Sequence, residues 1–506
     1  MGMRVDLVSA PSRYPRGPLF ILLAIAVVPT VALVALVVWS DREADSYDAA
    51  RDEAALVQDA LDESRDSTLS ASDEAAAALP TGLFNYRRAP REIAVLANGN
   101  MLAEALDPMY NFINDDSCVA VALNGQLISS KNPATPVIPA STQKLLVAAV
   151  ALETLGGDYN FTTTIASQAA VDGVVEGDIY LIGGGDPLLV SDDYPIDSDR
   201  YPEFSTTSLD RLADEFVDTG VTRVNGAVIG DGSRYDDEFV IASWGDGVAF
   251  VDGGPYDALL VNDSRVRGRS SRQRDPNEAA AREMARLLRN RGISVATGWA
   301  SGVADPAAPI VATVTSEPLS AAVREMLTTS DNNTAEMLLK EIGFADSGEG
   351  TVATGLTVVD RTLRGWGIPM DGVRLVDGSG LSPDNRITCA ALIGVLNHDI
   401  GGVLSTGLPL AGRTGTLADE FTESVMAGRL VAKTGTLSNP PAESDPPAVK
   451  ALAGYLPTDV GVLQFAIVQS GPDVTSDRKY ETLWLALTDR LDTYPAGPEF
   501  DLLGPK

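Results

Sequence analysis

Residues 138–155 read IPASTQKLLVAAVALETL, a short polar entry followed by an apolar run at helical spacing. Glycines at positions 156 and 157 come next, and glycine commonly follows the last residue of a helix. The stretch therefore predicts a helix over residues 141–155. Ser141 and Lys144 are three positions apart, so their side chains share one face of that helix. Free backbone N–H groups at a helix start can also stabilise an oxyanion beside the serine.

The segments around this helix predict one antiparallel sheet that both ends of the chain build. Residues 117–123 and 126–130 are rich in strand-forming residues, and the Asn124-Gly125 pair between them is typical of a hairpin turn. Strands and a helix are predicted near the C-terminus at 429–436, 451–456, 461–469 and 480–491. The residues between these two parts then form an insertion. Its predicted elements are short strands within 171–181, a strand at 224–229 and a helix at 278–291.

The N-terminal region predicts a membrane segment. Residues 19–39 carry no charge and are long enough, at 1.5 Å per residue, to cross a bilayer core about 30 Å thick. Arginines precede this stretch and acidic residues follow it, so the positive-inside rule places the N-terminus in the cytoplasm and the bulk of the chain outside. A cleaved signal peptide is the alternative to an anchor. The acidic residues 41–84 then form a solvated stalk.

Composition excludes several classes of function. A net charge of −32, from 38 basic and 70 acidic residues, argues against nucleic acid as a partner. His398 is the only histidine, which disfavours a Ser-His-Asp triad and a histidine-rich zinc site, and no metal or other cofactor is expected. The proton carrier of an enzyme is then a lysine or a carboxylate. Cys118 and Cys389 suit one disulfide in an oxidising compartment, with two unrelated buried thiols as the alternative.

Two further short motifs carry groups suited to acyl transfer. Ser330-Asp331-Asn332 lies between two predicted helices. Lys433-Thr434-Gly435-Thr436 ends a predicted strand, where alternation places Lys433 and Gly435 on one face and the threonines on the other. We expect the glycine to let a substrate backbone approach the strand, and a lysine beside hydroxyls suits a carboxylate. Each motif alone is a weak signal.

The order S-x-x-K, S-D-N and K-T-G defines the site of the penicilloyl-serine transferases. The sequence resembles the class C low-molecular-mass penicillin-binding proteins, which are D-alanyl-D-alanine carboxypeptidase/endopeptidases. The 189-residue separation of Ser141 and Ser330 matches their long insertion and not the far shorter gap of class A β-lactamases. Further segments carry the resemblance: 139–141 (PAS), 183–189 (GGGDPLL), 330–336 (SDNNTAE), 377–382 (DGSGLS), 415–417 (GTL), 432–437 (AKTGTL) and 453–455 (AGY).

The resemblance implies an α+β, multi-domain fold. Its main part is a penicillin-binding transpeptidase-like domain, which is an antiparallel sheet flanked by helices. An inserted, mainly β/α domain interrupts it. The expected divisions are 1–40 (cytoplasmic tip and membrane segment), 41–84 (stalk), 85–163 (peptidase domain, first part), 164–315 (insert) and 316–506 (peptidase domain, second part). It also implies a serine-type carboxypeptidase/endopeptidase that trims or uncrosslinks peptidoglycan through an acyl-enzyme on Ser141. Peptidoglycan stem peptides are then the substrates, and β-lactam antibiotics are inhibitors.

Acyl transfer and the resemblance together assign roles to the motif residues. Ser141 attacks the carbonyl and Lys144 removes its proton, which requires the pKa of this lysine to fall from about 10.4 towards neutrality. Burial and the neighbouring ammonium of Lys433 both lower it. Ser330 relays a proton to the leaving amine, and Asn332 holds a substrate amide. The N–H groups of Ser141 and Thr436 form the oxyanion hole. Thr434, Thr436 and Lys433, with Gly435 between them, hold the terminal carboxylate of the substrate.

Two positions bear on the third residue of the stem peptide. Relatives carry a basic residue shortly after the GTL segment that binds the carboxylate of diaminopimelate, and here that position is Glu420. Asp231 matches an acidic residue of the insert that binds the side-chain ammonium. The hypothesis is a site that keeps the amine partner, lacks the carboxylate partner and prefers amidated diaminopimelate, lysine or ornithine. A plain surface role for Glu420 is the alternative.

Two other functions stay open at the level of the sequence. A β-lactamase uses the same acyl-enzyme with faster hydrolysis, and the long insertion disfavours it. A catalytically decayed, peptidoglycan-binding envelope protein is the second, and the three intact motifs oppose it. The expected location is the extracytoplasmic face of the cytoplasmic membrane, or outside the cell if the segment 1–40 is cleaved.

Overall fold

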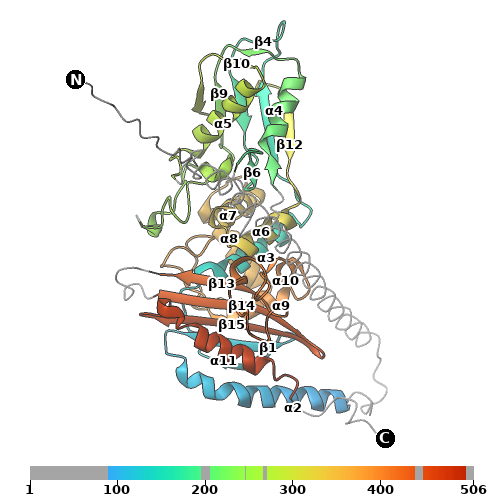
Figure 1. Ribbon diagram of the computed structural model, residues 1–506, viewed down its shortest axis with the longest axis vertical. Coiled ribbons are helices and arrows are strands. Elements are labelled where there is room, and N and C mark those ends of the chain that lie inside the picture. The colour runs from blue at the N-terminus through green and yellow to red at the C-terminus, as the bar shows by residue number, and fades with distance from the viewer. Residues whose placement is uncertain (1–88, 195–205, 246, 266–270, 439–447, 497–506) are drawn as a thin grey trace, which may run out of the picture. The chain divides into compact units, whose positions relative to one another are not determined.

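The computed structural model describes residues 89–194, 206–245, 247–265, 271–438 and 448–496 (Figure 1). The predicted membrane segment, 1–40, and the predicted stalk, 41–84, lie outside these residues. Within the described ranges, no helix has both the length and the apolar character needed to cross a membrane.

One five-stranded sheet unites the two ends of the described chain. Its order is β13-β14-β15-β1-β2, and every neighbouring pair is antiparallel. The strands are β1 (Cys118–Leu123), β2 (Gln126–Lys131), β13 (Val431–Leu437), β14 (Ala448–Thr458) and β15 (Gly461–Gly471). Because β1 pairs with β15, the predicted sheet from both ends of the chain is confirmed.

Helices cover both faces of this sheet. All six residues of β1 (CVAVAL) are buried, as expected of a continuous apolar strand. One face packs on α2 (Ala89–Leu106) and α11 (Glu481–Leu491), and the other on helices that include α3 (Lys144–Leu155) and α9 (Cys389–His398). Figure 1 shows α2 and α11 on the opposite side of the sheet from α3. The remaining elements of this part are η1 (Asp107–Phe112), η2 (Ala140–Gln143), α6 (Leu319–Thr329), α7 (Asn332–Ser347), α8 (Val352–Gly365), α10 (Val403–Gly407), η5 (Gly415–Leu417) and η6 (Ser476–Arg478).

The start of the predicted helix 141–155 differs from a regular α-helix. Residues Ala140–Gln143 form the 3-10 turn η2, and α3 begins only at Lys144. The turn opens with Ala140 in a left-handed conformation, at φ 47°. Side chains three positions apart eclipse each other in a 3-10 turn, so Ser141 stands directly beside Lys144.

A disulfide joins β1 to α9 and confirms the predicted pairing of the two cysteines. Cys118 and Cys389 have Cα atoms 5.9 Å apart and are 271 positions apart in the sequence. Both residues are completely buried. A cross-link that closes so long a loop stabilises a fold by about 2–5 kcal/mol, mainly by restricting the unfolded chain.

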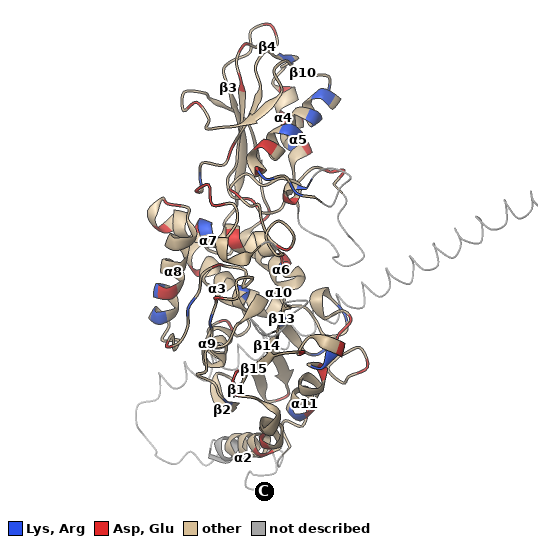
Figure 2. Ribbon diagram, turned by 90° about the vertical axis from the view of Figure 1, so that its left-hand side faces the viewer, with Lys and Arg blue, Asp and Glu red and all other residues tan. Residues whose placement is uncertain are grey.

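A second five-stranded sheet is built from residues between Thr162 and Thr315. Its order is β11-β9-β5-β3-β12, with β5, β9 and β11 parallel and with β3 antiparallel to both of its neighbours. The strands are β3 (Thr162–Ser167), β5 (Ile179–Ile182), β9 (Val228–Asp231), β11 (Trp299–Ser301) and β12 (Ile310–Thr315). Helices α4 (Leu209–Asp218) and α5 (Pro276–Asn290) share a separate core with it, and basic residues gather on α5 (Figure 2). We propose residues 164–315 as the inserted domain.

The predicted strand at 224–229 is wrong in one respect, because two short strands replace it. These are β8 (Arg223–Val224) and β9, separated by a turn in which a Cβ at Gly226 would clash with the backbone of Gly177. The turn lets β8 join a different, three-stranded sheet with β4 (Val174–Val175) and β10 (Ser294–Val295).

Buried charged groups fasten this second sheet to α7. The carboxylate of Glu341 accepts hydrogen bonds from Arg234 at 2.6 and 2.8 Å and from the Tyr235 hydroxyl at 2.8 Å. Lys340 Nζ lies 2.5 Å from the carboxylate of Asp236. Lys340 and Glu341 are completely buried, and removing one partner of a buried pair typically costs about 3–5 kcal/mol. The loop after β9 is thereby fixed to the helix that begins at Asn332.

Candidate active site

The amino group of Lys144 brings together three segments that are far apart in the sequence. Its Nζ lies 2.9 Å from Ser141 Oγ, 2.6 Å from Asn332 Oδ1 and 2.7 Å from the carbonyl oxygen of Ser379. Ser141 belongs to η2, Asn332 is the first residue of α7, and Ser379 lies in the segment 377–382. The serine and lysine of the first motif and the asparagine of the second therefore share one site.

These three oxygens satisfy the lysine in either protonation state. A charged ammonium donates three hydrogen bonds, one to each oxygen. A neutral amine donates two, to Asn332 and to the Ser379 carbonyl, and its lone pair accepts the hydrogen of the Ser141 hydroxyl. A proton can pass from Ser141 to Lys144 while the other two hydrogen bonds keep their geometry. This is what a general base beside a serine nucleophile requires.

Burial lowers the pKa of both lysines of the site. The side chain of Lys144 is completely buried, and the loss of solvation lowers its pKa from 10.5 to about 8. Three nearby carboxylates act in the opposite direction: Asp331, Glu336 and Asp377. Lys433 is also completely buried, and its pKa is well below the ordinary value because of burial and repulsion by Lys144 and Lys450. A charge on Lys144 thus opposes protonation of Lys433.

Glu336 positions the carbonyl group of Ser379, which accepts a hydrogen bond from Lys144. Its buried carboxylate accepts the N–H of Gly378 at 2.9 Å and the N–H of Ser379 at 2.7 Å. Burial beside Asp377 raises the pKa of Glu336 to about 8. Glu336 acts through the Ser379 carbonyl and is a positioning residue. The sequence signal that could have found it is its place one turn after Asn332, on the same helix face.

Asp377 joins the surrounding segments through one buried carboxylate. Its hydrogen-bond donors are Gln143 Nε2 (3.0 Å), Trp244 Nε1 (2.9 Å), Gly380 N (2.9 Å), Ser382 N (2.7 Å) and Asn385 Nδ2 (2.7 Å). Gln143 comes from η2, the turn that carries Ser141, and Trp244 from the proposed insert. The position of the turn thus depends on the same carboxylate as the segment 377–382.

Ser330 occupies the junction of α6 and α7 in a left-handed conformation, at φ 68° and ψ 34°. Such a conformation costs a non-glycine residue roughly 1 kcal/mol or more and is concentrated at functional sites. The next residue, Asp331, caps α7 by accepting the N–H of Thr334 at 2.6 Å. The cap fixes Asn332 as the first helical residue.

Gly435 packs closely against the turn that carries Ser141, and its role in admitting a substrate backbone stays a prediction. A Cβ at this position would lie 2.9 Å from the carbonyl oxygen of Pro139 and 3.2 Å from the Cβ of Ala140. Those residues immediately precede Ser141. The missing side chain lets β13 pack directly against the turn that carries the serine.

The open edge of β13 presents backbone donors beside this turn. The N–H of Ala432 bonds to the carbonyl of Pro409, on the side away from β14. Strand alternation places the N–H groups of Thr434 and Thr436 on the same side. Thr436 is the exposed residue of the strand. A donor in this position suits the predicted oxyanion hole.

The residues of the predicted carboxylate site separate into buried and exposed groups. Lys433 donates from Nζ to the Thr434 carbonyl at 3.0 Å, and the Thr434 hydroxyl lies 2.7 Å from the Thr416 hydroxyl. The hydroxyl of Thr436 instead lies 3.0 Å from the ammonium of Lys450. The exposed hydroxyl of Thr436 therefore lies beside a cation, Lys450, whereas the cation Lys433 is buried.

Asp231 and Glu420 have partners inside the protein. The carboxylate of Asp231, only 4% exposed, accepts the N–H groups of Ser233 at 2.8 Å and Ala304 at 2.7 Å. Glu420 is 8% exposed and bonds to Arg478 and Tyr480, each at 2.7 Å. The side chain of Glu420 is therefore buried in an internal network, and the carboxylate of Asp231 joins its own loop to the segment after β11. The substrate-binding roles of both residues stay predictions.

One acidic residue of the proposed insert that contacts the S-D-N motif is Asp252. Its backbone carbonyl accepts a hydrogen bond from Asn332 Nδ2 at 3.0 Å. Arg272 holds the flanking carbonyls of Val251 and Gly254 at 3.0 and 3.1 Å. The sequence offered no local signal for this residue, because only the packing of the insert brings its loop to Asn332.

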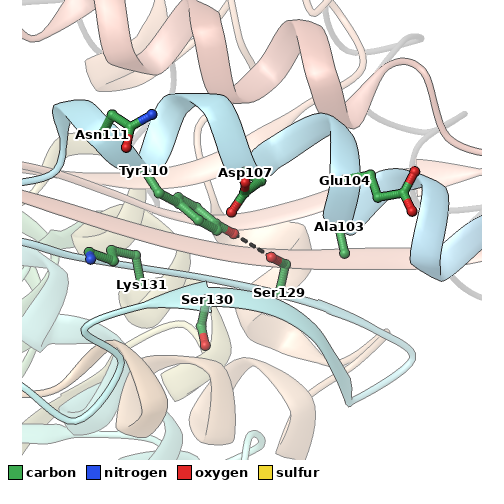
Figure 3. A pocket seen from close by; sticks show the side chains of 8 residues that line it. All are labelled: Ala103, Glu104, Asp107, Tyr110, Asn111, Ser129, Ser130 and Lys131. Carbon is green, nitrogen blue, oxygen red and sulfur yellow. Dashed lines mark hydrogen bonds between the residues drawn. The ribbon is translucent and has the colours of Figure 1, made fainter.

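A separate hollow of about 620 Å³ lies between α2, η1 and the edge strand β2. Figure 3 shows the hydrogen bond of 2.6 Å between Tyr110 and Ser129 that crosses it. None of the motif residues lines this hollow, and it is distinct from the site around Lys144.

Comparison with known proteins gives one family and several relatives. The model of the D-Ala-D-Ala carboxypeptidase 3 (S13) family matches residues 104–271 and 257–490. A D-alanyl-D-alanine carboxypeptidase from an Actinomadura species is 30% identical over 438 residues, which cover 72% of this chain and 79% of that protein. Carboxypeptidase DacB of Mycolicibacterium smegmatis is 33% identical over 371 residues, covering 69% and 74% of the two chains.

A solved structure shares the fold. The crystal structure of penicillin binding protein 4 from Haemophilus influenzae aligns with a TM-score of 0.63 at 20% identity, covering 77% of this chain and 99% of that chain. This likeness confirms the predicted α+β, multi-domain class, with an antiparallel sheet flanked by helices and interrupted by an insert.

Acylation by penicillin is expected to accelerate as the pH rises. The base is active when neutral, and a pKa of about 8 for Lys144 leaves roughly 1% of it neutral at pH 6 and half at pH 8. The second-order rate constant for labelling by a fluorescent penicillin should therefore rise roughly 50-fold between these pH values and level off above pH 9. Equal end-point labelling at both pH values controls for unfolding. A rate that is flat or falls with pH would contradict a neutral lysine base.

Gly435→Ala is expected to slow acylation about 100-fold. The added Cβ must displace the turn that carries Ser141, and a shift of about 1 Å at a reacting group costs on that order. Gly365→Ala is the matched control, because a Cβ at Gly365 meets no atom within 4 Å. Rate constants for labelling by a fluorescent penicillin measure both variants. Unchanged acylation in the Gly435 variant would show that β13 does not position the serine.

Proposed function

Because the chain belongs to the D-Ala-D-Ala carboxypeptidase 3 (S13) family, we propose that Ser141 is the nucleophile through which it works. The protein is a serine-type D-Ala-D-Ala carboxypeptidase, a penicillin-binding hydrolase that acts on peptidoglycan. The observation that carries the assignment of Ser141 is the 2.9 Å approach of its Oγ to the buried amino group of Lys144.

Acylation begins with transfer of the Ser141 proton to neutral Lys144. The Oγ forms a bond to the carbonyl carbon of the penultimate D-alanine, and the carbonyl oxygen becomes an oxyanion. The N–H groups of Ser141 and Thr436 stabilise it. Support comes from the open edge of β13, on which the N–H of Thr436 lies.

Collapse of this intermediate breaks the peptide bond. The leaving amine takes the proton that Lys144 received, relayed by Ser330, and the acyl group stays on Ser141 as an ester. Water then attacks the ester carbonyl carbon while neutral Lys144 takes a proton from it. As the bond between the acyl carbon and Ser141 Oγ breaks, Lys144 returns this proton to Oγ, which restores the free enzyme. Burial and repulsion by Lys144 and Lys450 lower the pKa of Lys433, so this lysine gives up a proton more readily than a lysine in water does. Asn332 keeps Lys144 in place and offers its amide to the substrate.

The same chemistry serves trimming of stem peptides and opening of cross-links, since both cleave the bond after a D-alanine. We assign the chain to the cell envelope, where this substrate lies. Residues 1–40 would anchor it in the cytoplasmic membrane, with the enzyme on the extracytoplasmic face. The uncharged stretch 19–39, preceded by arginines, supports this topology.

Asp252 takes the role first expected of Asp231, that of holding an ammonium on the stem peptide. Two contacts support this choice. The Asp252 carbonyl bonds Asn332, which places the residue beside the substrate amide. The carboxylate of Asp231 is occupied by two backbone N–H groups. An exposed carboxylate beside the site favours stem peptides whose third residue carries an amine.

Ser141→Ala is expected to abolish covalent labelling of the full chain by a fluorescent penicillin. The wild-type chain should form a stable adduct, because the ester on Ser141 hydrolyses slowly. Ser347→Ala, at the far end of α7, is the matched control and should label like the wild type. Labelling that persists in the Ser141 variant would assign the nucleophile to another residue. Rapid turnover of the drug by the wild type would instead indicate a β-lactamase.

Asp252→Asn is expected to raise KM about 3- to 10-fold for a stem peptide with a free amine on its third residue, with kcat nearly unchanged. This range of KM corresponds to the small free energy of a partly exposed ion pair between Asp252 and the amine of the peptide. The variant keeps the backbone carbonyl that bonds Asn332. A peptide with that amine acetylated is the control, and the two proteins should hydrolyse it equally. An equal change on both peptides would rule out recognition of the amine.

A further inference from the structure

Strand β14 places a lysine beside the last residue of the K-T-G-T motif. Lys450 is the register partner of Thr436, and its Nζ lies 3.0 Å from the threonine hydroxyl. Cross-strand partners point to the same face of a sheet. The exposed hydroxyl of Thr436 and the ammonium therefore form one polar surface at the edge of the site.

Aromatic rings hold this ammonium in place. Nζ lies 4.3 Å from the ring centroid of Tyr480 and 5.4 Å from that of Trp484, both on or beside α11. Cation–π contacts of this kind stabilise a lysine without neutralising it. Burial lowers the pKa of Lys450, while the nearby carboxylate of Glu420 raises it.

The nearby carboxylates are already engaged by other groups. Glu420 accepts from Arg478 through Oε2 and from the Tyr480 hydroxyl through Oε1, each at 2.7 Å. Glu481 pairs with the same arginine at 2.5 Å. Over the residues that the structure describes, the Thr436 hydroxyl is the one hydrogen-bond acceptor of Lys450. An ammonium donates three hydrogen bonds, so Lys450 can bind an additional anion.

The substrate carries a terminal carboxylate close to the carbonyl carbon that Ser141 attacks. The carboxylate carbon of a terminal D-amino acid is three bonds from the carbonyl carbon that Ser141 attacks, at most roughly 4 Å away. The oxyanion of that carbonyl is assigned to the N–H of Thr436. A cation that bonds the hydroxyl of the same residue is within reach of the carboxylate.

We propose that Lys450 and the Thr436 hydroxyl bind the carboxylate of the leaving D-amino acid and the corresponding carboxylate of a β-lactam. This inference rests on the proposed function and makes Lys450 a specificity-determining residue. Lys433 is the less suitable cation, because its side chain is completely buried and its Nζ donates to the Thr434 carbonyl.

The test compares an N-acetylated peptide ending in D-Ala-D-Ala with the same peptide ending in a carboxamide. For the full wild-type chain, kcat/KM should be at least about 30-fold higher for the free carboxylate, as a charge-assisted contact implies. Lys450→Met should lose most of that preference by slowing hydrolysis of the carboxylate peptide and leaving the carboxamide peptide within about threefold. Lys450→Arg should retain the preference within about fivefold.

Lys479→Met is the matched control, since this exposed lysine pairs with Asp473 and lies outside the site. A Lys450→Met chain that keeps the wild-type preference, or slows both peptides equally, would overturn the role of Lys450 while leaving Ser141 as the nucleophile. If this variant does not fold, Lys450→Gln takes its place with the same expectations. A wild type that hydrolyses neither peptide and forms no penicillin adduct would instead refute the proposed function.

Discussion

The burial of Lys144 is the constraint on which the described structure depends most. An ammonium removed from water loses several kcal/mol of solvation, and the protein offsets this only by supplying well-placed oxygens. Those oxygens come from η2, which carries Ser141, from the start of α7 and from the segment 377–382. Each of these segments must be held rigidly, since a displaced oxygen would leave a buried polar group unpaired. The same requirement that stabilises the lysine therefore also orders the site.

Helix α7 satisfies several of these demands at once. Its first residue, Asn332, bonds Lys144, and one turn later Glu336 holds the segment that supplies the third oxygen. About one turn after Glu336, Lys340 and Glu341 fasten the loop after β9. Helix α7 therefore contacts Lys144 at its first residue and the loop after β9 further along. The insert thus belongs to the framework of the site, both through α7 and through the contact of Asp252 with Asn332.

Sequence reasoning succeeded where the information is local and failed where it depends on distant packing. The hairpin, the C-terminal strands and the pairing of Ser141 with Lys144 follow from spacing within a few residues, and the structure contains all of them. A steric constraint on Gly435 comes from Pro139, almost 300 positions earlier in the chain. Asp252 and Lys450 acquire neighbours only through loop packing and strand register. The predictions for residues 1–84 concern residues that the structure does not describe.

The pairing of β1 with β15 has a consequence for the way the protein is made. The hydrogen bond between Ser117 and Ser470 spans 353 positions of sequence. A ribosome that adds about 5–20 residues per second needs on the order of 20–70 s to produce the second partner after the first. The sheet between Thr162 and Thr315 can form during that interval, whereas Ser141 waits for α7 and β13. In a nascent chain, the surroundings of Ser141 therefore stay incomplete until nearly the whole polypeptide has been synthesised.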